Sequence, residues 1–344
     1  TVKDNSLQGV TRFLEDQEGE YGKDEILLEN DTDLSGNLGE DGYSVVPALT
    51  TKQFTKLKQY ILEFIKDGLI RAVGLKKLES LEEKFGHFTI ENYHLFAEED
   101  DVHEKVFQHI RQGIILDSAL PDESGLFEVN LSDIVGKEIG HDVRIWLNTC
   151  YVRITRPNSS DNNPLHRDVY LSRLRNKINI YLPIAGSTPK SALGLIPGSH
   201  RWSEAMIART PNYATYKGRK FTVPAIVEVS KSSTEVIRVS PNYGEINIFS
   251  PYLIHGGGSN PGTETRCSLE VRFCSKQEKL FHEPILPLSS LGIGSIWYGM
   301  QWPPENKDWS KPDIQEVSST FHKIVNSSSK GILVDTAPCY RGAE

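Results

Sequence analysis

The residue pattern of this chain changes at Asp142, and this change constrains the fold more than any other feature. Before it, segment 51–73 carries apolar residues at helical spacing from Leu57 to Ile65, and residues 75–140 are also mostly helical and polar. After it, short runs rich in β-branched and aromatic residues alternate with Pro, Gly and Asn. Many short strands with frequent turns predict a β-sandwich or jelly roll.

The expected strands of this second part have a defined order. They lie in segments 143–157, 177–186, 193–199, 221–230, 244–255 and 265–273. A further short strand is expected at 42–49, directly before the first long helix. We therefore expect a mainly β protein with flanking helices, in which the N-terminal region is helical.

Charge is distributed unevenly along the chain. The net charge of the 344 residues is −8, but residues 1–41 hold 12 acidic and 3 basic residues, so this arm alone carries −9. A block of one charge sign is typical of a solvated segment. No basic face or aromatic-basic motif suggests binding to nucleic acid. With no apolar run of about 18 residues, no secretion signal and no CxxC spacing, we expect a cytoplasmic protein that does not enter membranes.

The tripeptide His166–Asp168, in "PLHRDVYLSRLRN", has two interpretations. The letters HRD open the catalytic loop of protein kinases, but Arg173 stands where a kinase needs a magnesium-binding Asn. The chain also has no Asp-Phe-Gly triplet. In a strand, by contrast, a His-x-Asp pair places both side chains on one side, where they can bind one metal ion. We therefore interpret His166 and Asp168 as metal ligands.

A third ligand should come from a distant strand, and His255 is suitably placed. It ends an apolar run and precedes three glycines, which allow close approach of the backbone to a neighbouring segment. Two histidines and one carboxylate on one face of an octahedral ion leave three positions open. Such a set suits non-haem Fe(II), which must bind a co-substrate and oxygen together.

A candidate co-substrate anchor lies eleven residues beyond the third ligand. Strand alternation in "TRCSLEVRF" places four polar residues on one face: Arg266, Ser268, Glu270 and Arg272. A buried arginine needs an anionic partner. A guanidinium fork matches a carboxylate, and a serine two residues on adds a hydroxyl donor. We expect Arg266 with Ser268 to bind the distal carboxylate of 2-oxoglutarate. Arg272, on the same face, is the second candidate for this anchor. The alternative is that Arg266 forms a structural ion pair with a glutamate.

Four motifs in succession resemble those of one known family. "NPLHRD", "LGLIPGSH", "GEINIFSPYLIHGGGSN" and "TRCSLEVRF" are similar to the motifs of phytanoyl-CoA dioxygenase-like proteins, which are Fe(II)- and 2-oxoglutarate-dependent oxygenases on a double-stranded β-helix (jelly roll). The resemblance implies that three catalytic residues bind iron, namely His166, Asp168 and His255. It also implies that four residues bind the co-substrate, namely Arg266, Ser268, Tyr181 and Asn179.

The resemblance also implies a reaction and a division of the chain. Oxygen is consumed, succinate and carbon dioxide are released, and the carboxylate at Asp168 favours C–H oxidation such as hydroxylation over halogenation. The similar region spans residues 42–276, including the helical insert 75–140. It is preceded by the acidic arm 1–41 and followed by a Pro- and Trp-rich extension, 277–344, which we expect to pack on the core.

The substrate is indicated only by local charge. Segment 201–234 has six basic and two acidic residues, so it is +4 within an acidic chain. A local positive field attracts a small molecule that bears a carboxylate or phosphate, although a solvated loop fits the same composition. The candidate substrate-binding residues are Arg173, Arg175, Arg219 and Lys220. A non-catalytic metal-binding scaffold or sensor and a zinc hydrolase remain alternatives, and the sequence predicts no oligomeric state.

Overall fold

The structure is a computed structural model, and it describes most of the chain between residues 36 and 276. The described residues are 3–5, 10–12, 36–111, 114–115, 124–140, 142–159, 161, 163–171, 174–210, 215–216, 219–220, 223–231, 234–257, 259–276, 292–294 and 333–335. The chain divides into two compact units, Thr1–Glu278 and Lys279–Glu344. In the second unit β16 (Gly292–Gly294) and β17 (Leu333–Asp335) form a parallel pair. Most of the 277–344 extension lies outside the described residues, so its packing on the core stays a prediction.

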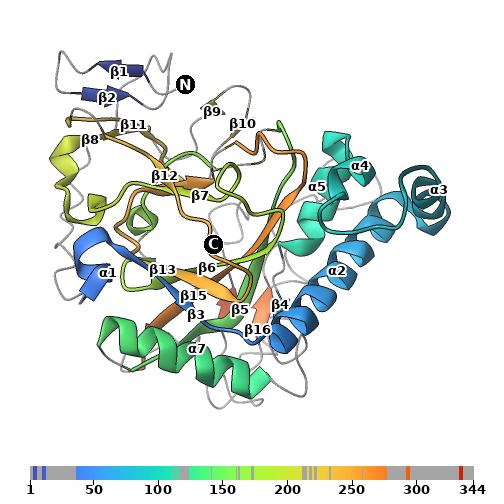
Figure 1. Cartoon of the computed structure of the whole chain (residues 1–344), viewed down its shortest axis with the longest axis horizontal. Coiled ribbons are helices and arrows are strands. Elements are labelled where there is room, and N and C mark those ends of the chain that lie inside the picture. The colour runs from blue at the N-terminus through green and yellow to red at the C-terminus, as the bar shows by residue number, and fades with distance from the viewer. Residues whose placement is uncertain are drawn as a thin grey trace, which may run out of the picture. The chain divides into compact units, whose positions relative to one another are not determined.

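A six-stranded antiparallel sheet forms the centre of the first unit (Figure 1). In spatial order its strands are β3 (Tyr43–Pro47), β13 (Glu245–Phe249), β6 (Ile178–Ala185), β15 (Arg266–Ser275), β5 (Val143–Thr155) and β4 (Ile114–Ile115). Strands distant in the sequence are therefore neighbours, as in a jelly roll. Each of the long strands overlaps a segment that the sequence pattern predicts, and β15 extends two residues beyond its predicted end.

Smaller sheets complete the β structure. A three-stranded sheet has the order β12 (Ile237–Arg238), β7 (Leu193–Leu195), β14 (His255–Gly257). A four-stranded sheet has the order β1 (Lys3–Asn5), β2 (Val10–Arg12), β11 (Ile226–Val229), β8 (Ile207–Arg209). β9 (Thr215–Tyr216) and β10 (Arg219–Lys220) form a hairpin.

The six- and three-stranded sheets face each other. Tyr181 and Phe249 of the large sheet pack in one buried cluster with Leu195 of β7 and Leu253 beside β14. The surface of the large sheet directed at this cluster is its inner face. Two sheets closed over a shared interior, with helices outside, form the double-stranded β-helix that we predicted from the sequence.

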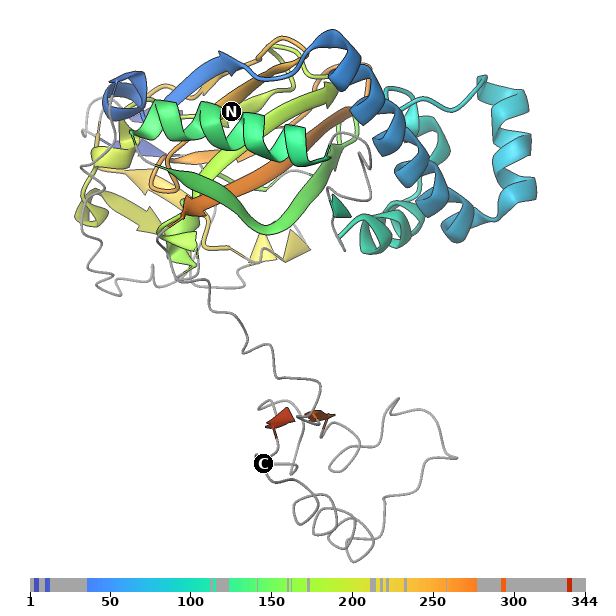
Figure 2. The same ribbon diagram turned by 90° about the horizontal axis from the view of Figure 1, so that it is seen from below.

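Helices flank the large sheet. They are α1 (Gly36–Asp41), α2 (Thr51–Val73), α3 (Leu75–Phe85), α4 (Tyr93–Phe96), α5 (Asp100–Ile110) and α7 (Ser124–Ile139). Figure 2 shows α7 lying across the strands and the helices α2 to α5 gathered at one end of them. No helix in the described part of the chain is both long and apolar enough to cross a membrane.

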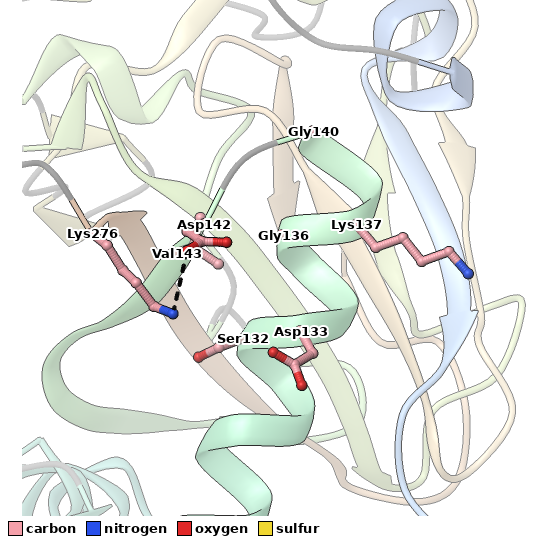
Figure 3. A pocket seen from close by; sticks show the side chains of 8 residues that line it. All are labelled: Ser132, Asp133, Gly136, Lys137, Gly140, Asp142, Val143 and Lys276. Atoms are coloured by element: carbon pink, nitrogen blue, oxygen red, sulfur yellow. Dashed lines mark ion pairs between the residues drawn. The ribbon is translucent and has the colours of Figure 1, made fainter.

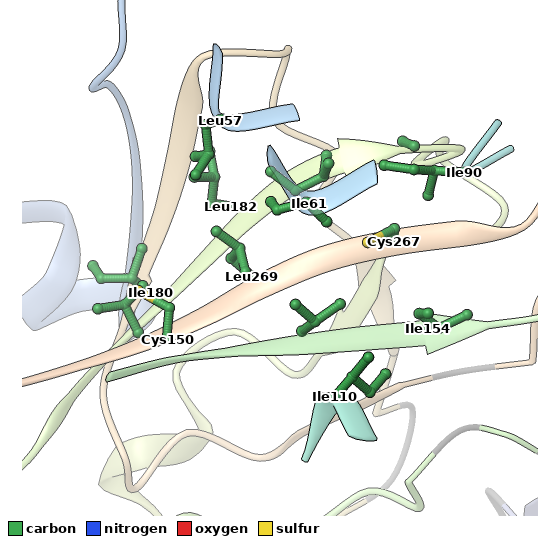
Figure 4. Close-up of a cluster of buried hydrophobic side chains, with 14 of the residues drawn as sticks. Leu57, Ile61, Ile90, Ile110, Cys150, Ile154, Ile180, Leu182, Cys267 and Leu269 are labelled. Atoms are coloured by element: carbon green, nitrogen blue, oxygen red, sulfur yellow. The ribbon is translucent and has the colours of Figure 1, made fainter. Parts of the chain in front are cut away.

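The main core lies between these helices and the outer face. α2 begins at a capping box on Thr50 and directs Leu57 and Ile61 towards Leu182 of β6 and Leu269 of β15 (Figure 4). Each such fully buried side chain contributes about 1.5–3 kcal/mol of transfer free energy. Because residues 267 and 269 point into this core, the alternate residues of β15 point to the inner face.

The acidic arm contributes to the fold through β2 and through α1. β2 pairs with β11, with Arg12 opposite Glu228 and Thr11 opposite Val229. The last six residues of the arm form α1, whose Leu38 is fully buried in the main core. The packed core of the structure thus includes a residue of the arm, while the division of the chain at position 42 stays a prediction.

Candidate metal centre and co-substrate pocket

The two candidate histidine ligands lie on adjacent segments joined by their backbones. His166 N donates to His255 O at 2.8 Å, and His255 N donates to His166 O at 3.0 Å. This antiparallel bridge places the two imidazole rings 4.5 Å apart between centroids. The glycine after His255 is necessary here, because a Cβ on Gly256 would lie 2.6 Å from Pro164 O. The close approach expected from the glycine run is therefore present at Gly256.

Asp168 joins the pair by a turn rather than by strand alternation. The sequence predicted a strand through His166 and Asp168, but the structure ends the bridge at His166 and begins a 3-10 helix at Asp168. A bond from Asp168 N to Pro251 O, 3.0 Å long, holds this turn. The three ligand atoms lie within 4.8 Å of one another, and Asp168 Oδ1 is 3.5 Å from His166 Nε2 and 3.9 Å from His255 Nε2.

Arg167, between the two ligands, points away from the centre. Its guanidinium forms an ion pair with Glu204 at 2.5 Å and donates to the carbonyls of Ser199 and Trp202. It is 1% exposed and ties the ligand segment to the turn that follows β7. Arg167 therefore supports the segment from outside the site.

Hydrogen bonds to the backbone fix the orientation of both imidazoles. His166 Nδ1 lies 2.8 Å from Pro164 O, and His255 Nδ1 lies 2.9 Å from Leu253 O. A carbonyl only accepts, so each Nδ1 carries the proton and each Nε2 is left with a lone pair for a metal. Burial, with the neighbouring His166, lowers the pKa of His255 to about 4, so this ring is neutral at pH 7.

The carboxylate of Asp168 has its second oxygen held from the large sheet. Asn179 Nδ2 donates to Oδ2 at 2.9 Å, and Arg272 Nη2 lies 3.5 Å from the same oxygen. Burial raises the pKa of Asp168, but the positive charge of Arg272 and other contacts in the site lower it, so that pKa lies below its usual range. The group is therefore an anion with Oδ1 directed at the two Nε2 atoms.

This donor set fits a divalent first-row metal ion. Two imidazoles and one carboxylate, all buried, converge from one side, and this arrangement is favourable when a cation binds between them. A metal ion held here by these three residues could also bind a co-substrate and oxygen, the chemistry that such a donor set supports. The structure thus brings together the three side chains that the sequence singled out, and their role as iron ligands stays a prediction.

Arg266 lies buried on the inner face without an acidic partner. Its Nη1 donates to Ser191 O at 2.8 Å and its Nη2 to Thr155 Oγ1 at 2.5 Å, while Nε has no hydrogen-bond partner in the described structure. No Asp or Glu of the described residues forms an ion pair with it. The alternative of a structural Arg266–Glu pair therefore has no support from these residues, and the side chain is 4% exposed.

The other predicted co-substrate residues lie on the same inner face but make different contacts. Ser268 is buried two residues along β15 from Arg266. Tyr181 lies in the cluster between the sheets, and its hydroxyl is 2.9 Å from Ser187 Oγ. Asn179 contacts Asp168 rather than the region of Arg266. The structure thus brings Asn179 to the candidate metal ligands and leaves Tyr181 in the cluster between the two sheets.

The predicted substrate residues are only partly described. Arg175 Nε donates to Val169 O at 3.2 Å, next to the ligand segment. Arg173 lies outside the described residues. Arg219 and Lys220 form strand β10, and their side chains are not described.

Sequence analysis did not predict some partners of the site. Thr155 and the carbonyl of Ser191 orient Arg266, and only the alternation of strand 143–157 could have indicated Thr155. The contact between Arg272 and Asp168 was also missed, although both residues had been singled out for other roles.

A separate pocket lies on the outer side of the structure, at the end of α7 (Figure 3). Its volume is about 390 Å³, and an ion pair between Asp142 and Lys276 crosses it at 3.7 Å. The lining residues are Ser132, Asp133, Gly136, Lys137, Gly140, Asp142, Val143 and Lys276. They include no histidine or cysteine, and this pocket shares no residue with the metal centre.

Fold and site together define a metal-dependent oxygenase of the double-stranded β-helix class. The chain belongs to the phytanoyl-CoA dioxygenase (PhyH) family, whose sequence profile matches residues 38–268. The resemblance predicted from the motifs is confirmed. Family membership makes the protein an oxidoreductase of the Fe(II)- and 2-oxoglutarate-dependent oxygenases.

Several solved structures are similar to this chain. AviO1 from Streptomyces viridochromogenes Tue57 is 14% identical, with a TM-score of 0.39, over 73% of this chain and 96% of that one. The epimerase SnoN from nogalamycin biosynthesis, in complex with Fe3+, alpha ketoglutarate and nogalamycin RO, is 15% identical, with a TM-score of 0.40, over 70% and 81%. EctD from S. alaskensis, with 2-oxoglutarate and 5-hydroxyectoine, is 15% identical, with a TM-score of 0.44, over 72% and 78%. No curated protein sequence matches the chain.

Proposed function

We propose that the protein oxidises a C–H bond of a small anionic organic molecule, by hydroxylation or a related step, with His166, Asp168 and His255 as iron ligands. The observation that carries this proposal is the buried convergence of two Nε2 atoms on one carboxylate oxygen, within 4.8 Å. Iron and 2-oxoglutarate, when bound, supply the oxidising chemistry, with oxygen consumed and succinate and carbon dioxide released.

The protein's own residues hold and orient the reactants. The Nδ1–H bonds of the two histidines fix the rings, so that both Nε2 atoms stay directed at the same point. The contacts on Asp168 Oδ2 leave Oδ1 as the ligand atom. The apolar cluster around Phe249, whose ring lies 4.8 Å from that of His255, keeps water from one side of the centre.

Arg266, with Ser268, anchors the distal carboxylate of 2-oxoglutarate in this proposal. A buried guanidinium with a free Nε–H and no acidic partner in the described structure is suited to an incoming carboxylate. Arg238 adds to the positive potential, because it lies near Arg266; burial, and then the charge of Arg266, lower the pKa of Arg238. Tyr181 lines the space between anchor and metal.

Anaerobic titration tests the reaction class. Fe(II) and 2-oxoglutarate, added together to the wild-type protein, should give the weak visible charge-transfer band of the chelate. His166→Ala and Asp168→Ala should lose iron binding and succinate formation, while Arg71→Gln, which removes an exposed arginine of α2, should behave as the wild type. A folded wild-type protein without the band would favour a non-catalytic metal-binding scaffold, and turnover in either ligand variant would overturn the ligand assignment.

The anchor is tested by comparing the two arginines of β15. Arg266→Ala should raise the 2-oxoglutarate concentration needed for half-maximal band intensity by a factor of 100 or more, which is about 3 kcal/mol for a charge-assisted contact. Arg272→Ala should change iron affinity more than co-substrate affinity. The opposite result would exchange the two assignments.

The anionic substrate is proposed from the charge of segment 201–234, which includes Arg219 and Lys220 of β10. Neutralising these two residues together should weaken substrate binding and reduce its dependence on salt, with 2-oxoglutarate affinity unchanged. Arg175, which contacts the segment of Asp168, is a further candidate for substrate binding. Equal salt dependence in the double variant and the wild type would make the segment a solvated loop.

A further inference from the structure

A buried chain of alternating charges leads away from the metal centre. Arg272 lies against Asp168 Oδ2 at 3.5 Å and also forms an ion pair with Glu270. Arg153 of β5 completes the chain, with its Nη2 2.6 Å and its Nε 2.7 Å from Glu270 Oε2. The side chain of Asp168 is 5% exposed and that of Arg153 is 37% exposed, so the chain runs from the centre towards solvent.

The register of the strands explains why these residues meet. Arg272 of β15 is paired with Asn179 of β6, so the two groups that contact Asp168 Oδ2 are cross-strand neighbours on the inner face. Glu270 precedes Arg272 on the same face of β15, and Tyr151 and Tyr181 are its cross-strand partners. The large sheet thus presents a fixed pair of donors to the ligand segment.

We propose that Arg272, held by Glu270, is a positioning residue that keeps Asp168 a one-oxygen ligand. This inference rests on the proposed iron site and goes beyond it. With Asn179 and Arg272 both at Oδ2, the carboxylate cannot turn to give both oxygens to the ion. A bidentate carboxylate would occupy a position that a chelating co-substrate or oxygen needs.

The charge of Arg272 matters more than its hydrogen-bond geometry. At 3.5 Å its contact with Asp168 is long for a hydrogen bond but short for two opposite charges in a buried place. The ion pair of Arg272 with Glu270 is closer than its contact with Asp168. Glu270 is therefore the group that fixes Arg272 in place, and Arg153 offsets the charge of Glu270.

Three variants separate positioning from folding. Arg272→Gln removes the charge and keeps a polar group of similar length. Arg272→Lys restores the charge without the planar fork. Because Arg272→Gln leaves Glu270 with one cation, the double variant Glu270→Gln/Arg272→Gln removes both charges together and should unfold within a few degrees of the wild type. Arg71→Gln is the matched control for loss of one arginine.

The measurements are the Fe(II) dissociation constant, by competition with a fluorescent chelator, and the position of the anaerobic Fe(II)·2-oxoglutarate band. We expect Arg272→Gln and the double variant to weaken Fe(II) binding by about 10- to 100-fold, as loss of a group that orients a ligand does, and to shift the band. Arg272→Lys should recover most of the affinity.

Two outcomes would overturn the inference. One is a folded Arg272→Gln protein with Fe(II) affinity within twofold of the wild type and an unshifted band. The other is an Arg272→Lys protein as weak as Arg272→Gln. Failure of the proposed function is distinguishable from both, since the wild-type protein would then show neither the band nor competition with the chelator.

Discussion

Replacing Gly256 by Ala tests whether the backbone bridge between the two histidines builds the metal centre. The added Cβ would lie 2.6 Å from Pro164 O and 2.9 Å from Leu165 N, whereas ordinary contact begins at 3.4 Å. Both obstructing atoms belong to the backbone and cannot turn away. The segment of Gly256 and the segment of Pro164 must therefore separate by 3.4 − 2.6 = 0.8 Å. Bonds of 2.8 and 3.0 Å between His166 and His255 cannot survive that separation.

The expected cost has two parts. Overpacking costs about 1–3 kcal/mol, and two lost hydrogen bonds add about 1 kcal/mol each, so we expect a loss of about 3–5 kcal/mol of unfolding free energy without metal. For a domain of this size, 3 kcal/mol lowers Tm by about 6–12 °C. Metal sites tolerate about 0.2 Å of ligand displacement, so Fe(II) affinity should fall by more than tenfold in addition.

Thermal unfolding in EDTA and chelator competition measure the two parts separately. Gly194→Ala is the matched control in the same small sheet, because its Cβ would be crowded by a side-chain atom, Val236 Cγ1 at 3.1 Å, and would make only ordinary contact, at 3.4 Å, with the backbone O of Gly256. We expect it to cost less and to keep its metal affinity. A Gly256→Ala protein that loses no more unfolding free energy than Gly194→Ala and binds Fe(II) with an affinity within twofold of the wild type would contradict this prediction. The backbone bridge would then not be what positions the two histidines for metal binding.

Further predictions concern groups away from the metal. Asp161→Asn should destabilise the protein by about 3–5 kcal/mol in urea unfolding, because it leaves buried Arg156, whose Nε lies 2.9 Å from Asp161, without its closest buried anion. Burial raises the pKa of Asp161, but hydrogen bonds from Arg156 and the charge of His103 outweigh it and lower that pKa. The stability of the wild type should therefore fall as the pH drops through the acidic range. The variant should lose less stability over the same range. Burial raises the pKa values of Cys150 and Cys267 to about 12, so neither should react with a thiol reagent at pH 8 until the protein unfolds, as mass mapping of the modified peptides can show.

Sequence reasoning succeeded where a periodic pattern has one structural solution. The spacing of Leu57 and Ile61 indicated helix α2, and alternation along β15 placed Arg266 and Arg272 on one face. These patterns depend only on residues close together in the sequence, so they predict structure without knowledge of the strand order. They also located the candidate ligands, because His-x-Asp and a distant histidine before glycines are unusual in combination.

The same reasoning failed where partners come from distant strands. Asp168 lies on a 3-10 turn because its backbone bonds to Pro251, a contact that no local pattern indicates. Arg272 faces Asp168 because of the pairing of β15 with β6, and a shift of one residue in this register would remove the contact. Prediction of side-chain partners therefore requires the strand order, which the sequence did not provide.

The bridge between His166 and His255 also determines how a bound metal would leave. The two ligand segments are bonded to each other, and β14 is itself bonded to β7 through Leu195. Opening the site by moving either histidine thus requires several backbone bonds to break in one event, so a bound ion should exchange slowly unless the whole small sheet opens. An ion bound at 100 times its dissociation constant would raise the free energy of that opening by about 2.7 kcal/mol. A bound ion should therefore make opening of the small sheet rarer, and the closed sheet should slow release of the ion. Proteases should cut the metal-free protein first near these two segments.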